Sequence, residues 1–586
     1  MESVPKLPRR SERFHKMTTH AAVLAALLGL ALATASCSVA PTPESSASQP
    51  TQEQTSAAPA PQAPAQASPA DRTGRAGQED PGTRPLGWGP QQQDADAARG
   101  AVDAMSLEQQ AGQVLLPFYT GTDHQPRAAD IERLHLAGSI IMGDNVPGTA
   151  AGQVDTGAMS AVTRRLQSAA TADGRSWPGM IAVDQEGGAV ARLRAPLTEW
   201  PAPMSYGAAG SRPLAAEAGQ AMSSELLALG FNVDFAPTAD VTMGPSDPTI
   251  GARSMSGSAV AAADLGVAFS RGMLAAGMLP AAKHFPGHGS VSVDSHQGLP
   301  VQPASLDQLR ARDLLPFKAA IDAGLPMVMT GHIVVPALEP EVPASVSKAA
   351  YAELRGMGFR GVTVTDALNM DALKGRFPDG SAAPAALAAG ADLLLMPADV
   401  GAAHAAIVRS VRSGALASER LAEAAQRVVT MMIWRGRTGA PPGSEPGSGT
   451  DVSRRVSAAA ITVLTGPCSG PMVPPSVRLT GGTDQDRARF AAAARGVGIS
   501  IGHGPLVSLI GYRRPPADPA APVADVAVTL DAPWALADSA ASARIALYGR
   551  SQGAFDALAA VLAGKAAAPG KLPVAVGAQN PGSGCG

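Results

Sequence analysis

The 586-residue sequence has little charge and few aromatic side chains, at 16% and 4% of its residues. Its 46 basic and 49 acidic residues leave a net charge of -3, so it has no basic excess with which to grip a phosphate backbone. Nucleic acid is therefore not an expected partner. Hydrophobic residues make up 45% of the chain, which is enough for a large core and excludes a wholly disordered protein.

Cysteine is also scarce. The three cysteines, at positions 37, 468 and 585, are too few and too scattered for a zinc cage or a dense disulfide framework. Any metal would need oxygen or histidine ligands. We expect neither a metal nor a cofactor.

The N-terminal region predicts an export signal followed by a tether. Basic residues precede an apolar run over residues 21–36, which is short for a membrane span. Residues 1–37 are predicted to be a lipoprotein signal peptide, because Thr34–Cys37 resembles a bacterial lipobox in which Cys37 is lipidated. The alternatives are an ordinary signal peptide and a transmembrane anchor. Residues 38–95, rich in Pro, Ala, Ser and Gln, predict a disordered linker. The protein is thus expected to be exported and lipid-anchored to the outer face of the cell membrane.

Eight short apolar runs recur between residues 100 and 436, most of them separated by enough chain for a helix. They begin near residues 113, 138, 179, 231, 277, 325, 361 and 391. Apolar runs that alternate with helices are typical of buried parallel strands, and eight of them favour a closed barrel over an open sheet. We therefore predict an α/β fold in which residues 96–436 form a (β/α)8 TIM-like barrel. Residues 305–324 supply one candidate helix of this barrel.

A Gly- and Pro-rich break over residues 437–452 precedes a smaller domain, residues 453–586. Apolar runs that begin at 461, 476, 505, 525 and 544 predict strands, and the residues from 551 predict a helix. We expect an αβα sandwich with a structural or substrate-positioning role. Its two cysteines, Cys468 and Cys585, could pair after export.

Polar residues close several of the eight runs in the predicted barrel. They are Asp184, Asp240, Lys283, His284, His332 and Asp366. Catalytic groups of such barrels lie where strands end, although a single polar residue there could simply cap the next helix. Together, these residues predict an active site at the carboxyl ends of the strands.

The densest motif is KHFPGHG at residues 283–289, followed by Asp294-Ser295-His296. A carboxylate two residues before an imidazole can hold one ring nitrogen and direct the other at a substrate, which suits acid/base catalysis. The alternative is a metal site formed by the histidines, which lacks a flanking acidic cluster or cysteine. Asp366, opposite such a histidine, suits attack on an anomeric carbon.

These motifs, with DQEGG at 184, NVDFAP at 232, MTGH at 329 and TDALNM at 365, resemble glycoside hydrolase family 3, and more narrowly its β-N-acetylhexosaminidase branch. The resemblance implies that Asp366 is the nucleophile and that His296, supported by Asp294, is the acid/base. It implies sugar-binding roles for five further residues: Asp184, Arg192, Arg253, Lys283 and His284.

The activity implied is that of a retaining exo-β-N-acetylglucosaminidase acting on terminal β-linked GlcNAc, in peptidoglycan fragments or related glycans. A carbohydrate is thus the expected partner, besides the membrane that holds the lipid anchor. Two alternatives remain open. One is a glycoside phosphorylase, because a histidine acid/base does not repel incoming phosphate; the other is a sugar-binding lipoprotein without activity.

Overall fold

The computed structural model describes residues 81–295, 297–373, 375–439, 441–511 and 523–586. The predicted signal peptide with Cys37, most of the predicted linker, and His296 lie outside the described residues. All the described residues belong to one compact unit, Gly77–Gly586.

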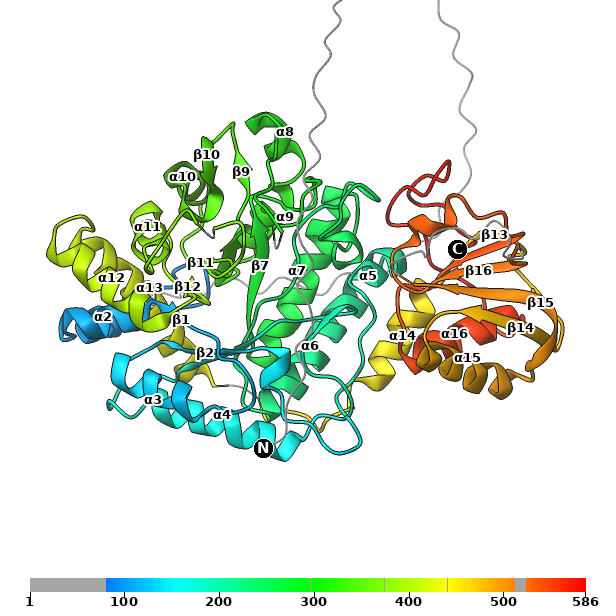
Figure 1. Ribbon diagram of the computed structural model, residues 1–586, viewed down its shortest axis with the longest axis horizontal. Coiled ribbons are helices and arrows are strands. Elements are labelled where there is room, and N and C mark those ends of the chain that lie inside the picture. The colour runs from blue at the N-terminus through cyan, green and yellow to red at the C-terminus, as the bar shows by residue number, and fades with distance from the viewer. Residues whose placement is uncertain (1–80, 296, 374, 440, 512–522) are drawn as a thin grey trace, which may run out of the picture. The chain divides into compact units, whose positions relative to one another are not determined.

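Eight parallel strands form the first domain, one in each of the eight apolar runs (Figure 1). They are β1 (Leu115–Leu116), β2 (Gly138–Ile141), β3 (Met180–Val183), β6 (Val233–Asp234), β7 (Leu279–Phe285), β8 (Met327–Thr330), β11 (Val362–Thr365) and β12 (Leu394–Leu395). Six of them form a sheet in the order β11-β8-β7-β6-β3-β2, and β1 pairs with β12. A parallel bridge from Val364 to Leu393 links β11 to β12, and the Ile140 N–H donates to Pro117 O between β2 and β1. The circle is thereby closed, and the predicted (β/α)8 barrel is confirmed.

A helix follows each barrel strand, which is why the strands can run parallel. These helices are α3 (Gln125–Leu134), α4 (Thr156–Ala170), α6 (Arg212–Ala228), α7 (Ala259–Ala276), α9 (Leu315–Asp322), α10 (Lys348–Gly356), α11 (Ala382–Ala389) and α12 (Val400–Arg412). Side chains of Asp155, Ser211, Ser258 and Asp399 cap the N-termini of α4, α6, α7 and α12. Two helices precede the barrel, α1 (Gln92–Asp103) and α2 (Leu107–Gln113), and α13 (Ser418–Thr438) follows it.

The candidate helix at residues 305–324 is two helices. Ser305 caps α8 (Leu306–Ala311) as expected, but the chain then breaks and α9 begins at Leu315. Pro316 lies in the first turn of α9. A proline lacks the N–H that a continuous helix would need and clashes with the preceding turn, so it begins a helix more readily than it continues one.

The folded domain also begins earlier than the expected boundary at residue 96. Residues 81–95, which the sequence assigned to the linker, contain the first turn of α1 and the buried Trp88. Asp94 is 1% exposed and accepts both Nε and Nη2 of Arg437, near the end of α13. A buried aromatic ring and an ion pair with a buried carboxylate therefore connect this segment to the folded domain.

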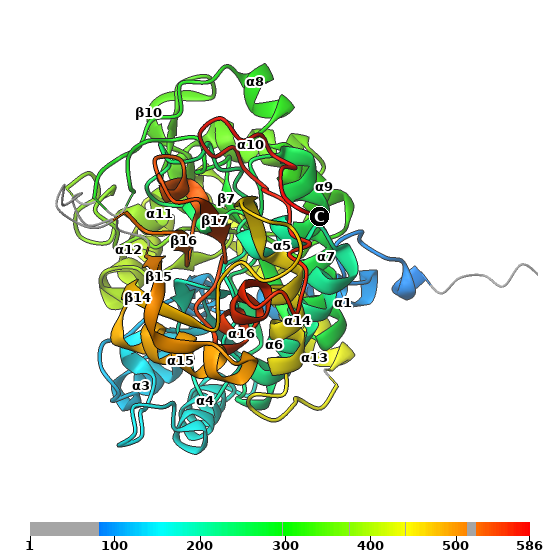
Figure 2. The ribbon, with the colours of Figure 1, turned by 90° about the vertical axis from the view of Figure 1, so that its right-hand side faces the viewer.

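A five-stranded mixed sheet forms the second domain (Figure 2). Its strands are β13 (Thr462–Thr465), β14 (Ser476–Gly481), β15 (Ser500–Ile510), β16 (Val526–Thr529) and β17 (Ala543–Ala546), in the order β13-β17-β16-β15-β14. Its helices are α14 (Thr450–Ala460), α15 (Asp484–Val497) and α16 (Gln552–Leu562). Only β13 is antiparallel to its neighbour.

The two faces of this sheet are covered differently. Val526, Val528 and Ile545 point to one face and pack with residues of α15 and α16. Ala527 and Ala546 point to the other and belong to a cluster that includes residues of α5 (Met204–Ala209) in the barrel domain. The barrel therefore supplies part of the second helical layer, and alanines on this face of the sheet let α5 approach closely.

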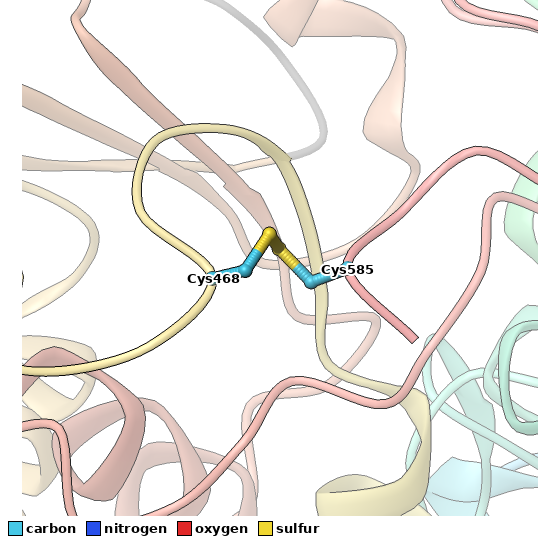
Figure 3. The surroundings of a disulfide bond; sticks show 2 residues. All are labelled: Cys468 and Cys585. Carbon is cyan, nitrogen blue, oxygen red and sulfur yellow. A yellow bond between two sulfur atoms is a disulfide. The ribbon is translucent and has the colours of Figure 1, made fainter.

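Cys468 and Cys585 form a disulfide with a Cα–Cα distance of 5.4 Å (Figure 3). Cys468 follows β13, and Cys585 is the penultimate residue of the chain. The bond closes a loop of 117 residues, which spans nearly the whole second domain. Closing a loop of this length removes much of the entropy of the unfolded chain.

Candidate active site

A cavity of about 310 Å³ opens at the carboxyl ends of the barrel strands. Six of the eight residues predicted for the site line it: Asp184, Arg192, Arg253, Lys283, His284 and Asp366. They come from four different strands and the loops that follow them, as the barrel geometry requires. The structure thus brings together residues that lie up to 182 positions apart in the chain.

Asp184 follows β3 and is held between two cations. Lys283 Nζ lies 2.8 Å from its Oδ1, and Arg192 Nη2 lies 3.2 Å from its Oδ2. Burial opposes ionisation of this carboxyl group, but Lys283 and Arg192 outweigh it and lower its pKa. The ionised form of Asp184 is therefore favoured, and its oxygens are hydrogen-bond acceptors at the cavity wall.

Glu186 also lines the cavity, although the sequence motifs did not single it out. Its side chain is 0% exposed and accepts two hydrogen bonds of 2.8 Å from Arg253, besides lying 2.7 Å from Lys283 Nζ. Burial raises its pKa, but Arg253 and Lys283 prevail and hold the pKa well below its usual range. The signal was present in DQEGG, because residues two apart in an extended segment point to the same side.

Lys283 is thereby fixed between two carboxylates. Its side chain is 3% exposed, and although burial lowers the pKa of the ammonium group, Asp184 and Glu186 raise it above its ordinary value. Asp234, the last residue of β6, is fully buried nearby, and burial raises its pKa well above the usual value. Burial thus favours the protonated form of Asp234, in contrast to Asp184 and Glu186, whose charges are paired with cations.

Asp240 organises the turn that carries the two histidines. Its carboxylate lies 2.7 Å from His284 Nδ1 and accepts the backbone N–H groups of His284 and His288. His288 Nε2 lies 2.9 Å from the Ser295 hydroxyl. Burial and the neighbouring His284 lower the pKa of His288 to about 4, so this ring is neutral at pH 7. His288 and Ser295 both line the cavity, which brings the residue preceding His296 to its wall.

Asp366 directly follows β11, and its backbone N–H donates to Thr330 O of β8. The Ala367 N–H donates to Asp366 Oδ1 over 2.8 Å and orients the carboxylate. His332 does not line the cavity: its ring lies 2.7 Å from Ser345 Oγ and 2.9 Å from Ala367 O, so it supports the backbone beside Asp366. Asp240 likewise acts from outside the cavity lining.

Asp294 lies in the loop after β7 and is not among the cavity-lining residues. Its backbone carbonyl accepts the N–H groups of Gln297 and Gly298. His296 itself lies outside the described residues, so its role stays a prediction.

Among the described residues of the cavity wall, carboxylates and Lys or Arg side chains are equal in number. Three carboxylates, of Asp184, Glu186 and Asp366, face three cations, of Arg192, Arg253 and Lys283. Four methionines add an apolar part to the wall: Met142, Met329, Met370 and Met396. Dense charge-assisted donors and acceptors next to an apolar surface suit a neutral, hydroxyl-rich ring with a carbon face.

The chain is similar to known proteins. Residues 106–431, more than half of the chain, match the family described as Glycosyl hydrolase family 3 N terminal domain. The chain belongs to glycosyl hydrolase family 3. This confirms the resemblance drawn from the motifs, and as a family 3 protein the chain has close relatives among curated sequences and solved structures.

Two of these relatives are beta-hexosaminidases. Beta-hexosaminidase A of Pseudoalteromonas piscicida is 37% identical over 335 residues, which are 51% of this chain and 55% of that protein. Beta-hexosaminidase of Stenotrophomonas maltophilia is 40% identical over 250 residues, 41% of this chain and 74% of that protein. The chain thus spans little more than half the length of the first relative.

A solved structure matches over a longer stretch. The glycoside hydrolase family 3 beta-N-acetylglucosaminidase from Paenibacillus sp. FPU-7 has a TM-score of 0.72 and 28% identity, and the match covers 80% of this chain and 99% of that one. The matched 80% of this chain is more than the barrel domain alone occupies. The likeness therefore includes part of the second domain.

Proposed function

We propose that the protein is a retaining exo-β-N-acetylglucosaminidase that removes terminal β-linked GlcNAc from peptidoglycan fragments or related glycans. The observation that carries the proposal is the convergence of Asp366 with the Asp184–Lys283–Glu186–Arg253 cluster in one cavity. Relatives named beta-hexosaminidase and a neighbour named beta-N-acetylglucosaminidase support the choice of sugar.

In the first step, an oxygen of Asp366 attacks the anomeric carbon and the bond from that carbon to the leaving oxygen breaks. His296 donates its proton to the leaving oxygen, so the leaving group departs as a neutral alcohol. The product is a glycosyl ester on Asp366. The Ala367 N–H, which donates to Asp366 Oδ1, holds the carboxylate in place for this attack.

In the second step, His296 takes a proton from water, the water oxygen attacks the anomeric carbon, and the ester bond to Asp366 breaks. The sugar leaves with the configuration it had in the substrate. His296 must be charged in the first step and neutral in the second, which a pKa near neutrality allows. Asp184 and the cations around it hold the sugar during both steps.

Turnover of aryl β-glycosides of GlcNAc, GalNAc, glucose and xylose tests the proposal. We expect cleavage of the GlcNAc substrate above all others, with the β-anomer of the free sugar as first product by NMR. The same assay with added phosphate separates hydrolysis from phosphorolysis, since a phosphorylase would release GlcNAc-1-phosphate. If none of the substrates is turned over, the proposal is refuted, and a sugar-binding protein without activity is the remaining interpretation.

We also propose that the protein works outside the cell, anchored by lipid on Cys37. The Cys468–Cys585 disulfide supports export, because structural disulfides persist in oxidising compartments. Radioactive fatty acid fed to producing cells should label the protein but not the Cys37→Ala variant. Cys468→Ser is the matched control and should keep the label. Equal label in Cys37→Ala would refute the anchor.

A further inference from the structure

A second cavity, of about 430 Å³, adjoins the candidate active site. Thr249, Ile250 and Arg253 line both cavities, so the two lie side by side at the turn that carries Arg253. The barrel contributes the tip of the hairpin between β4 (Gln185–Gly187) and β5 (Val190–Ala191), which includes Ala189. The second domain contributes Arg489 of α15 and residues that follow β16 and β17.

The location suits a ligand. The cavity lies beyond the carboxyl ends of β16 and β17, where Asp531 and Arg550 line it, and next to the carboxyl ends of the barrel strands. Ligands of parallel α/β sheets bind beyond the carboxyl ends of the strands in both architectures. Trp200 and Ile250 give the wall an apolar part against which a ring can pack.

Most of the charges in this wall are already balanced. Arg489 lies 2.8 Å from Glu199. Arg550 lies 2.7 Å from each of Asp486 and Asp531.

Arg194 is different. It lines the cavity and is exposed, and its guanidinium has no hydrogen-bond or ion-pair partner among the residues that the structure describes. The second cavity therefore has a guanidinium without a protein partner, whereas each arginine that lines the first cavity is paired with a carboxylate.

We propose that this second cavity binds the leaving-group side of the substrate, and that Arg194 selects a leaving sugar that carries a carboxylate. The inference rests on the proposed function, since a terminal sugar held beside Asp366 must extend its leaving group out of the first cavity. A guanidinium binds a carboxylate through two parallel N–H donors, which a neutral sugar cannot match.

A matched pair of disaccharides tests this. Both carry terminal β-1,4-linked GlcNAc; one has a free carboxylate on the leaving sugar and the other has that group converted to a primary amide. We expect kcat/KM to favour the acid about three- to tenfold, with the preference falling as salt rises. The pair is made with N-acetylmuramic acid and again with glucuronic acid, because the lactyl ether and the uronate offer the same carboxylate from different ring positions.

Arg194→Gln should reduce the acid-to-amide ratio to about one, and Arg194→Lys should restore part of it. The ratio cancels any general loss of activity, and a melting curve checks the fold. Arg212→Gln is the matched control, since Arg212 is 69% exposed and lines neither cavity. Ala189→Phe, which fills the second cavity, should raise KM for both disaccharides relative to a nitrophenyl β-GlcNAc.

A wild-type ratio of one for both sugars, or an unchanged ratio in Arg194→Gln, would overturn the inference. Either result can occur while the nitrophenyl substrate is still cleaved, so the proposed function would stand. Absence of nitrophenyl cleavage by the wild-type protein would instead refute the function itself.

Discussion

Two clusters of buried charge lie at opposite ends of the barrel and use similar groups. At the amino ends, Asp392 precedes β12, is 0% exposed and lies 2.6 Å from both Arg355 and Arg420 and 3.0 Å from Arg427. At the carboxyl ends, Glu186 is also 0% exposed and pairs with Arg253 and Lys283. In both clusters the cations overcome the effect of burial and lower the pKa of the carboxyl group.

The clusters differ in what is left for a ligand. Both oxygens of Asp392 are used by the protein, through the arginines and through the N–H and hydroxyl of Thr363. Lys283 and Arg253 face a cavity. In such barrels, residues at the amino ends of the strands contribute to stability, whereas active sites lie at the carboxyl ends. The same ion-pair chemistry therefore has different consequences at the two ends.

The largest expected effect separates chemistry from stability. Asp366→Ala should lower kcat on nitrophenyl β-GlcNAc by about 10³-fold or more, because it removes the proposed nucleophile that forms the covalent intermediate. The melting temperature should change little, since Asp366 is only partly buried and closes a strand instead of filling the core. Kinetics beside a thermal melt measure both, and substantial remaining activity would remove Asp366 from the nucleophile's role.

Asp392→Asn should do the reverse. Three partly buried guanidinium groups would lose their shared counter-ion, which costs about 3 kcal/mol in the free energy of unfolding. kcat at 25 °C should stay near that of the wild type. Denaturant titration measures the loss, and Asp322→Asn, which breaks the exposed pair with Lys318, is the control, expected to change stability by less than about 1 kcal/mol. Equal effects of the two variants would contradict the view of a closed stabilising cluster.

Glu186→Gln tests the open cluster with an isosteric change. The substitution removes one of the charges that fix Lys283 and Arg253, so kcat/KM should fall by about 100-fold. Stability should fall less than in Asp392→Asn, because Asp184 still pairs with Lys283 and the cavity admits water. A variant with a large loss of stability but normal kcat/KM would place Glu186 with the structural cluster.

The sequence predicted the barrel well because its strands are buried on both faces and therefore appear as continuous apolar runs, such as MIAV in β3. It predicted Asp184, Lys283 and Asp366 because strand ends mark where barrel residues converge. It did not predict the break before Pro316 or the burial of Trp88, which depend on local proline geometry and on contacts with distant helices.

The charge clusters show the same limit. Glu186 stands two residues after Asp184, but its partner Arg253 comes from 67 positions away. Asp392 draws its arginines from α10 and α13, and no local pattern connects them. The end of the barrel that a carboxylate occupies decides whether it lies in a closed cluster or beside the cavity, and this becomes visible only when the strands are assembled.

The smallest expected effect concerns acid. The pKa of Asp392 is lowered to about 2, because Arg355, Arg427 and Arg420 outweigh the opposing effect of burial, whereas in the unfolded chain it is near 3.8. A carboxyl group whose folded pKa is lowered stabilises the fold above its unfolded pKa and loses that contribution as pH falls toward its folded pKa. Asp392 should therefore contribute about 2 kcal/mol to the free energy of unfolding at pH 5, and this contribution should disappear between about pH 4 and pH 2.

Denaturant titrations of the wild type and of Asp392→Asn across this range measure the contribution, since the amide does not titrate. The difference in unfolding free energy between the two proteins should shrink by that amount as pH falls. A difference that stays constant would mean that the arginines do not depend on the charge of Asp392.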